Sequence, residues 1–162
     1  MLAVATLRPQ TGAIVERTYL EDIEVGLELV SDPRTITSAD IAAFAELSGD
    51  HNPLHTEATA VGDASPFDAP IAHGLFVTSI SSGQPTSADR WALGIYLEET
   101  RRFVAPVFAG DAIRTASTVT EVRRSRSKPD RGIVTMQVRV LNQRDELVQE
   151  GVDLVLVGAR SS

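Results

Sequence analysis

The clearest pattern along the chain is an alternation of apolar and polar side chains between Ile133 and Leu141. Four apolar residues at even positions are separated there by polar ones at odd positions, a period typical of a β-strand with one buried face. Three other apolar segments of similar length, 93–104, 112–122 and 147–157, are also predicted as strands. The second half of the chain is therefore expected to form an antiparallel sheet.

Edge-strand and helix-start patterns precede this sheet. Segment 28–36 is predicted as a first strand, although Pro33 confines it to a sheet edge or a bulge. Thr37 and Asp40 have the spacing of a capping box, and Gly49 is well suited to end the helix that follows. These positions predict one short helix directly after an edge strand.

A second helix is predicted between Ile71 and Ser82. Its apolar residues are spread around the helical wheel, which indicates burial on most sides, and Gly83 suits its end. Strands together with a mostly buried helix predict an α+β domain, with an antiparallel sheet packed on a central helix. Because one helix cannot cover both faces and the edges of such a sheet, we expect a homodimer or a higher homo-oligomer.

Composition narrows the classes of function. The 162 residues fit one domain, for which we expect residues 19–162, with residues 1–18 as a loosely ordered leader. No apolar run approaches the roughly 20 residues that span a bilayer, so no membrane partner and a cytoplasmic location are expected. A net charge of −7 disfavours nucleic acid as a partner. The absence of cysteine excludes thiolate nucleophiles, so any catalysis uses oxygen and nitrogen groups.

Segment 48–55, SGDHNPLH, concentrates polar groups. It is consistent with an Asx-turn, in which Asp50 and Asn52 accept hydrogen bonds from backbone N–H groups. It is also consistent with an acid–base pair made by Asp50 and His55. His51 is expected to point to solvent.

The start of the second helix supplies a complementary group. A helix N-terminus offers unpaired N–H groups and the positive end of the helix dipole. Gly74 has no side chain, so a ligand carbonyl can approach its backbone closely. Together with an acid–base pair, this N–H favours chemistry through an enolate-like intermediate. His73 makes either a hydrogen bond at the helix start or a direct contribution to the chemistry.

These motifs together resemble those of MaoC-like (R)-specific enoyl-CoA hydratases and dehydratases. SGDHNPLH is followed, eighteen residues after His55, by His73 in PIAHG. Segment 103–111, FVAPVFAGD, is similar to the strand and turn that follow the helix in that family. The resemblance spans roughly residues 35–157. It implies a hot dog fold, in which an antiparallel sheet wraps a long central helix and two subunits join their sheets edge to edge.

The resemblance also implies a reaction, the reversible addition of water to a trans-2-enoyl-CoA to give an (R)-3-hydroxyacyl-CoA. Asp50 would accept a proton from the water, and His55 would orient the water and help to return a proton to C2. Asn52 would support the loop, and the Gly74 N–H would bind the thioester oxygen. Because the thioester itself acidifies the α-position, no metal or redox cofactor is expected, and the CoA thioester is the substrate.

Several other residues have two interpretations. Ser82 either supports the catalytic loop or bonds back to its own helix. Leu54 and Phe76 either bind the acyl chain or pack in the core, and Trp91 either bounds the acyl pocket or anchors a dimer. The same choice between acyl pocket and core applies to three further apolar residues, Phe44, Phe67 and Ile80.

A basic loop occupies positions 123–131, where RRSRSKPDR has five basic residues and one acid. It is either a solvated hairpin loop that protects a sheet edge or a contact for the CoA phosphates. In the second interpretation Arg124, Arg126 and Lys128 bind those phosphates.

Two other functions remain open for a hot dog protein of this kind. One is an acyl-CoA thioesterase, which the intact hydratase motif disfavours because no alternative acid lies on the central helix. The other is a non-catalytic acyl-CoA-binding subunit, which the presence of both Asp50 and His55 disfavours.

Overall fold

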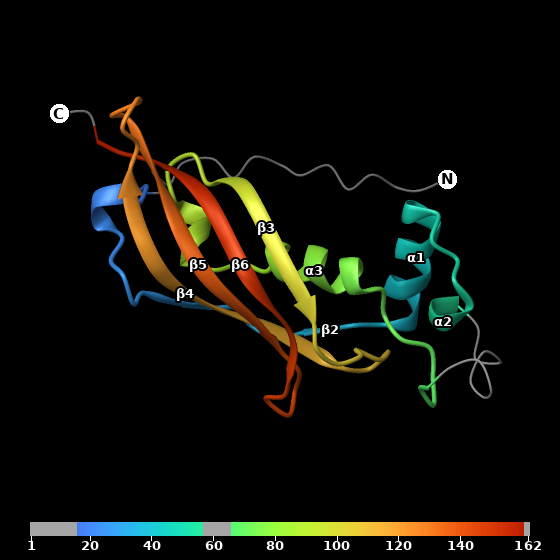
Figure 1. Ribbon diagram of the computed structural model, residues 1–162. Coiled ribbons are helices and arrows are strands. Elements are labelled where there is room, and N and C mark those ends of the chain that lie inside the picture. The colour runs from blue at the N-terminus through green and yellow to red at the C-terminus, as the bar shows by residue number, and fades with distance from the viewer. Residues whose placement is uncertain (1–15, 57–65, 161–162) are drawn as a thin grey trace.

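The protein is described here from a computed structural model that covers residues 16–56 and 66–160. A strongly twisted antiparallel sheet lies against helix α3, and α1 and α2 lie beyond the N-terminal end of that helix (Figure 1). The strands follow the order β1-β4-β5-β6-β3, and β2 also pairs with β4. The elements are η1 Leu20–Asp22, β1 Glu28–Val30, β2 Arg34–Thr35, α1 Ser38–Ser48, α2 Pro53–Thr56, α3 Gly74–Gly83, η3 Ser87–Arg90, β3 Ile95–Phe103, β4 Ala112–Arg124, β5 Arg131–Leu141 and β6 Leu147–Gly158.

The alternation that predicted a strand is confirmed in β5. Val134, Met136, Val138 and Val140 are all buried, whereas Gln137 and the other odd positions at the centre of the strand are more exposed. Each buried side chain of this size contributes about 1.5–3 kcal/mol relative to the exposed state. Among the described residues the sheet has six strands rather than the five predicted, because the first predicted strand, 28–36, forms two short strands.

Pro33 divides the first predicted strand, as expected of proline. β1 and β2 pair with different parts of β4, and residues 31–33 between them are not in a strand. The capping box is also confirmed, since the Thr37 hydroxyl accepts a hydrogen bond from the Asp40 N–H and the Asp40 carboxylate accepts one from the Thr37 N–H. Gly49 ends α1 with φ 76°, a conformation that favours glycine.

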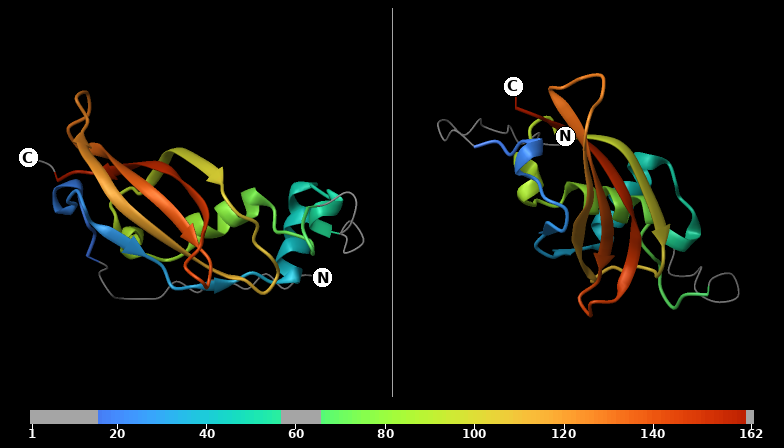
Figure 2. Two further views of the ribbon diagram at one scale, coloured as in Figure 1. Left: turned by 60° about the horizontal axis from the view of Figure 1, so that its bottom comes forward. Right: turned by 60° about the vertical axis from the view of Figure 1, so that its left-hand side comes forward.

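Helix α3 lies along one face of the sheet, which curves over it (Figure 2). It has ten residues and begins at Gly74, so it is shorter than the long central helix that the resemblance implies. Phe76 and Val77 belong to a core cluster with residues of α1, β4, β5 and β6, and this cluster fixes α3 against both the sheet and α1. Leu75, in contrast, is 66% exposed, and Ser79 on the same side is also exposed, so the helix is buried on most sides, as predicted, and faces solvent on one.

Strand β3 forms one edge of the sheet and is exposed along most of its length. Trp91, just before it, is 6% exposed and packs in the second core cluster with Leu20 and Val157, so it is not a surface anchor. Thr18 pairs with Trp91 and its neighbours, which ties the chain from this point into the fold. The rest of the predicted leader, residues 1–15, lies outside the described residues. Within the described part of the chain, no helix has the length and apolar character needed to span a membrane.

Candidate active site

The loop after α1 is shaped by its own polar side chains. The Asp50 Oδ1 atom accepts a hydrogen bond from the Asn52 N–H at 3.2 Å, and the Asn52 Oδ1 atom accepts one from the Leu54 N–H at 3.0 Å. The Asx-turn interpretation is therefore confirmed, and Asn52 does support the loop. The same turn leaves the second carboxylate oxygen of Asp50 available, so it is compatible with an acid–base role.

Two imidazole rings are fixed beside this loop by main-chain carbonyl groups. His55 Nδ1 lies 2.8 Å from the Ile71 carbonyl oxygen, and His73 Nε2 lies 2.9 Å from the Asp50 carbonyl oxygen. Because a carbonyl oxygen only accepts hydrogen bonds, both of these nitrogens donate. In the neutral rings the other nitrogens, His55 Nε2 and His73 Nδ1, are then acceptors.

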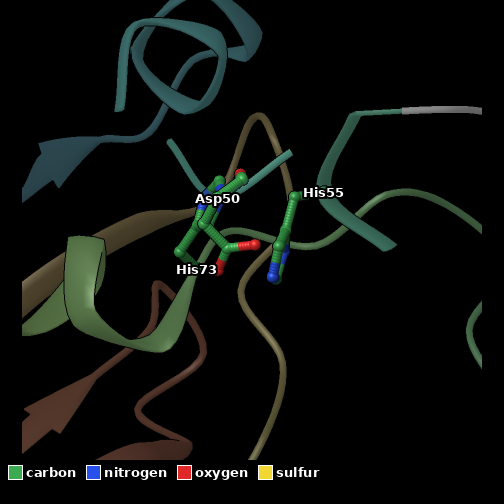
Figure 3. A group of neighbouring side chains, drawn as sticks. All are labelled: Asp50, His55 and His73. Carbon is green, nitrogen blue, oxygen red and sulfur yellow. The ribbon is translucent and has the colours of Figure 1, made fainter. Parts of the chain in front are cut away.

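The three side chains converge although they come from two segments. One ligand atom from each of Asp50, His55 and His73 lies within 4.8 Å of the others, and Figure 3 shows the Asp50 carboxylate directed toward the His55 ring. The two rings stack, with centroids 3.8 Å apart. His73 is 2% exposed, and its Nδ1 atom is buried with no hydrogen-bond partner among the described residues.

The cluster opens into a cavity of about 630 Å³ with a largely apolar lining. Asp50, His55 and His73 lie at one side of this cavity, and Gly74 at the start of α3 lies in its wall. Ser48, Phe44, Phe67, Leu75, Val77, Phe103, Val104 and Gln149 are among the other lining residues. An acid, an imidazole acceptor and a helix N-terminus thus face one apolar space.

Gly74 also lies close to strand β3. A Cβ atom at this position would lie 2.9 Å from the Phe103 ring, so a larger residue here would displace that ring, while the backbone of Gly74 lies in the wall of the cavity. The carbonyl oxygen of Gly74 accepts hydrogen bonds from the Gln149 amide at 2.8 Å and the Thr78 hydroxyl at 3.1 Å. These bonds fix the first turn of α3, whose leading N–H groups have no partner within the helix.

Several predicted site residues lie elsewhere. Phe76 is 6% exposed and packs against Phe44 in the core, and Leu54 is half-buried without lining the cavity. The Ser82 hydroxyl lies 3.0 Å from the Thr78 carbonyl oxygen, the partner in its second interpretation, and 2.7 Å from the Glu99 carboxylate, so its one hydrogen is donated to one of these acceptors at a time. It lines a different cavity, so it does not support the catalytic loop.

The basic loop is also far from the site. It forms the turn between β4 and β5, at the opposite end of the sheet from α1 and α2 (Figures 1 and 2). Arg124 forms an ion pair with Glu21 and donates to the Pro129 carbonyl oxygen at 2.9 Å. Arg126 and Lys128 are exposed in this turn. None of the three lines the cavity at Asp50, so the structure brings none of them to this site, and their role as CoA-phosphate ligands stays a prediction.

Gln149 and Phe103 were missed as site residues. They face each other in the register of β6 and β3 and both lie on the side of the sheet that faces α3. One sequence pattern could have indicated Gln149. It is a polar residue at an odd position of β6, and other odd positions of this strand, such as Val155 and Val157, face the core.

An antiparallel sheet wrapped on a helix, with an acid and two imidazoles at the start of that helix, defines a hot dog protein with a candidate acid–base site. The sequence model of the MaoC like domain matches residues 24–141, and the chain belongs to this family.

Two curated relatives have the same extent as this chain. A 3-hydroxybutyryl-CoA dehydratase from Methylorubrum extorquens is 34% identical over 86% of this chain and 83% of its own length. An (R)-specific enoyl-CoA hydratase from Aeromonas caviae is 33% identical over 83% of this chain and 96% of its own length.

Solved structures confirm the fold. A protein from Archaeoglobus described as a monoamine oxidase regulatory protein has a TM-score of 0.80 and 32% identity, over 90% of this chain and 97% of that one. A Mycobacterium tuberculosis protein with a double hotdog fold has a TM-score of 0.75 over 93% of this chain and 47% of its own, at 20% identity, which shows the fold alone.

Proposed function

We propose that the protein is a hydratase/dehydratase that adds water reversibly across the double bond of a trans-2-enoyl-CoA to give an (R)-3-hydroxyacyl-CoA. The observation that carries the proposal is the convergence of the Asp50 carboxylate, the His55 Nε2 acceptor and the start of α3 on one apolar cavity. The names of the two relatives, an (R)-specific enoyl-CoA hydratase and a 3-hydroxybutyryl-CoA dehydratase, support the same reaction class.

In this mechanism a water molecule lies between Asp50 and His55. Its two hydrogens donate to the free carboxylate oxygen and to Nε2, and its oxygen attacks C3 as Asp50 accepts a proton. The π electrons of the double bond move to C1 and its oxygen, where the Gly74 N–H and the α3 dipole stabilise the enolate charge. The proton held by the Asp50–His55 pair is then returned to C2, so that one water is added in total.

No metal or redox cofactor has a role in this proposal. The thioester already acidifies C2, so the protein needs only a base and an oxyanion donor. The stacking of His55 on His73, with an interplanar angle of 28°, also argues against a shared metal ion. A metal lies near the plane of each imidazole that ligates it, and the planes of two stacked rings run side by side.

We also propose a homodimer formed through β3. Ile95, Tyr96 and Leu97 on this edge strand are 47–50% exposed. At the other end of the strand Phe103 is 55% exposed, and Leu75 of α3, which lines the same cavity as Phe103, is 66% exposed. An edge strand with unpaired backbone groups and apolar side chains favours pairing with a second copy about a two-fold axis.

The reaction is tested by following the loss of the enoyl thioester of crotonyl-CoA and by determining the chirality of the product. We expect Asp50→Asn and His55→Gln each to fold and to lose most of the rate. Asparagine retains an oxygen for the turn at position 50, so it removes the proton acceptor alone. His51→Gln is the matched control, because His51 is exposed and lies 3.8 Å from Glu46 rather than at the cavity.

Two other results would contradict the proposal. Release of free CoA thiol from an acyl-CoA would indicate thioester hydrolysis instead. Calorimetric binding of acyl-CoA without turnover of any enoyl-CoA would indicate a non-catalytic binding subunit.

A further inference from the structure

A second cavity lies farther along α3, between the helix and the same strands. Its volume is about 200 Å³, and Ser82, Tyr96, Arg101 and Asp153 are among its lining residues. Within the described part of the chain, no residue lines both this cavity and the one at Asp50. The two cavities are therefore separate spaces along one helix, with the start of α3 at the first and its end at the second.

A buried polar bridge stands between them. The Thr78 hydroxyl lies 3.0 Å from the Gln149 Oε1 atom, and the Gln149 amide donates to the Gly74 carbonyl oxygen. Thr78 is 8% exposed and Gln149 is 2% exposed. Thr78 follows Gly74 by one helical turn and precedes Ser82 by another, so the bridge joins α3 to β6 midway between the cavities.

The second cavity has charged side chains in its wall. The Arg101 guanidinium contacts Asp153 at 2.5 Å and Glu99 at 2.8 Å, and the side chains of Arg101 and Asp153 are only 5% and 4% exposed. The Arg101 Nε–H is buried with no hydrogen-bond partner among the described residues. Burial raises the pKa of Asp153, and the contact with Arg101 offsets part of this effect. An apolar chain that entered here would leave these groups without water and without new partners, which is unfavourable.

We propose that the Thr78–Gln149 bridge is the inner limit of the acyl site and restricts the enzyme to short acyl groups. The inference rests on the proposed function, because it places the acyl chain of the substrate in the cavity at Asp50. A chain that extends along α3 from a thioester at Gly74 meets the bridge first and the Arg101–Asp153 pair beyond it. Short enoyl groups end before the bridge, whereas medium-length groups have to displace it.

The test compares the affinities of two saturated CoA thioesters, butyryl-CoA and octanoyl-CoA, by calorimetry with the full chain. We expect the wild type to bind octanoyl-CoA at least about tenfold more weakly, and Gln149→Ala to remove most of that difference. Gln137→Ala is the matched control, since it removes the same side chain from the opposite face of the sheet, where Gln137 is exposed. If Gln149→Ala does not fold, Gln149→Ser removes the same reach and retains a hydroxyl.

A second pair of variants tests the charged cavity. In the Gln149→Ala background, joint replacement by Arg101→Met and Asp153→Leu is expected to strengthen octanoyl-CoA binding further, because the two buried charges are removed together. Glu99, the other partner of Arg101, has a side chain that is 32% exposed and keeps its contact with water. The control is the joint replacement Arg102→Met and Glu150→Leu. This pair is exposed and lies on the other face of the same two strands.

The inference would be overturned if the wild type bound butyryl-CoA and octanoyl-CoA with equal affinity. It would also be overturned if the folded variant of Gln149 kept the wild-type ratio of these two affinities. Hydration assays with crotonyl-CoA and trans-2-octenoyl-CoA separate this result from a failure of the proposed function. Chain-length discrimination in binding without any hydration supports the limit and contradicts the hydratase. Hydration of both substrates with equal kcat/KM supports the hydratase and contradicts the limit on chain length.

Discussion

The buried ring of His73 donates a hydrogen bond to the main-chain carbonyl of Asp50 across 2.9 Å. The bond links the residue before α3 to the loop after α1, and the two bonded residues are 23 positions apart in the sequence. The same ring stacks on His55. One side chain thus contacts both members of the proposed acid–base pair, and we expect His73 to be a positioning residue, the first of its two predicted roles.

We expect His73→Phe to keep the stacking and lose this hydrogen bond. The loop then shifts relative to the cavity, and displacements of about 1 Å lower rates by about 100-fold. The loss of one hydrogen bond costs only about 1 kcal/mol of the free energy of unfolding. Steady-state kinetics and thermal unfolding measure the two effects, with His51→Phe as the exposed control. An unchanged kcat would remove the positioning role.

We expect Gly74→Ala to reduce activity more than stability. The new methyl group meets the end of the Phe103 ring, which is 55% exposed and therefore free to shift, so unfolding should change by less than about 1 kcal/mol. The displaced ring narrows the cavity where the thioester oxygen meets α3, and kcat/KM should fall about tenfold. Adding Phe103→Leu should restore part of the rate, with Phe103→Leu alone as the control. If Phe103→Leu does not restore part of the rate, contact with Phe103 is not the cause of the fall in kcat/KM.

Thr37→Ala tests the cap of α1, the helix that carries the Asp50 loop. Loss of the hydroxyl should cost about 1 kcal/mol of the free energy of unfolding at neutral pH, with Ser38→Ala as the control. The Thr37 hydroxyl and N–H lower the pKa of the Asp40 carboxyl in the folded protein.

The sign of the pH dependence follows from this shift. Because the folded-state pKa of Asp40 is depressed, its stabilising effect is present above the unfolded pKa of about 3.9 and is lost as pH falls through the folded value. The difference between wild type and Thr37→Ala should therefore shrink in acid. Urea unfolding at pH 7 and below pH 4 measures it, and a constant difference would contradict the coupling.

Leu97→Arg tests the dimer. A charge on the exposed β3 edge should convert the dimer to a monomer in sedimentation velocity experiments. Pairing of two such strands would remove water from the arginine guanidinium, which is unfavourable. Val25→Arg is the control, since Val25 is 64% exposed and lies between η1 and β1. Identical sedimentation of both variants and the wild type would place the interface elsewhere.

Local patterns in the sequence predicted most of the elements. The period of two in β5, the Thr37–Asp40 box and the two glycines near the helix ends depend only on neighbouring residues. The site at Asp50 was predicted in the same way, because a single short segment contains the acid, the amide that shapes the loop and one imidazole.

Long-range relationships could not be predicted in this way. β4 has thirteen residues and spans about 40 Å, which carries the basic loop to the far end of the sheet. Ser82 lies eight residues beyond Gly74, or about 12 Å along α3, so it faces the second cavity. Phe103 and Gln149 come together only through the register of β3 and β6, which no local pattern specifies.

The carboxylate of Asp50 shapes its loop and is also the proposed proton acceptor. A substitution that removes both oxygens would distort the loop and abolish the chemistry together, so the resulting loss of rate would have no single cause. For an engineer who wants a binding-competent but inactive protein, asparagine is consequently the informative choice at this position. The conformation of the loop and the proposed reactivity both depend on the Asp50 side chain. Asparagine separates the two, because it keeps an oxygen for the turn and removes the proton acceptor.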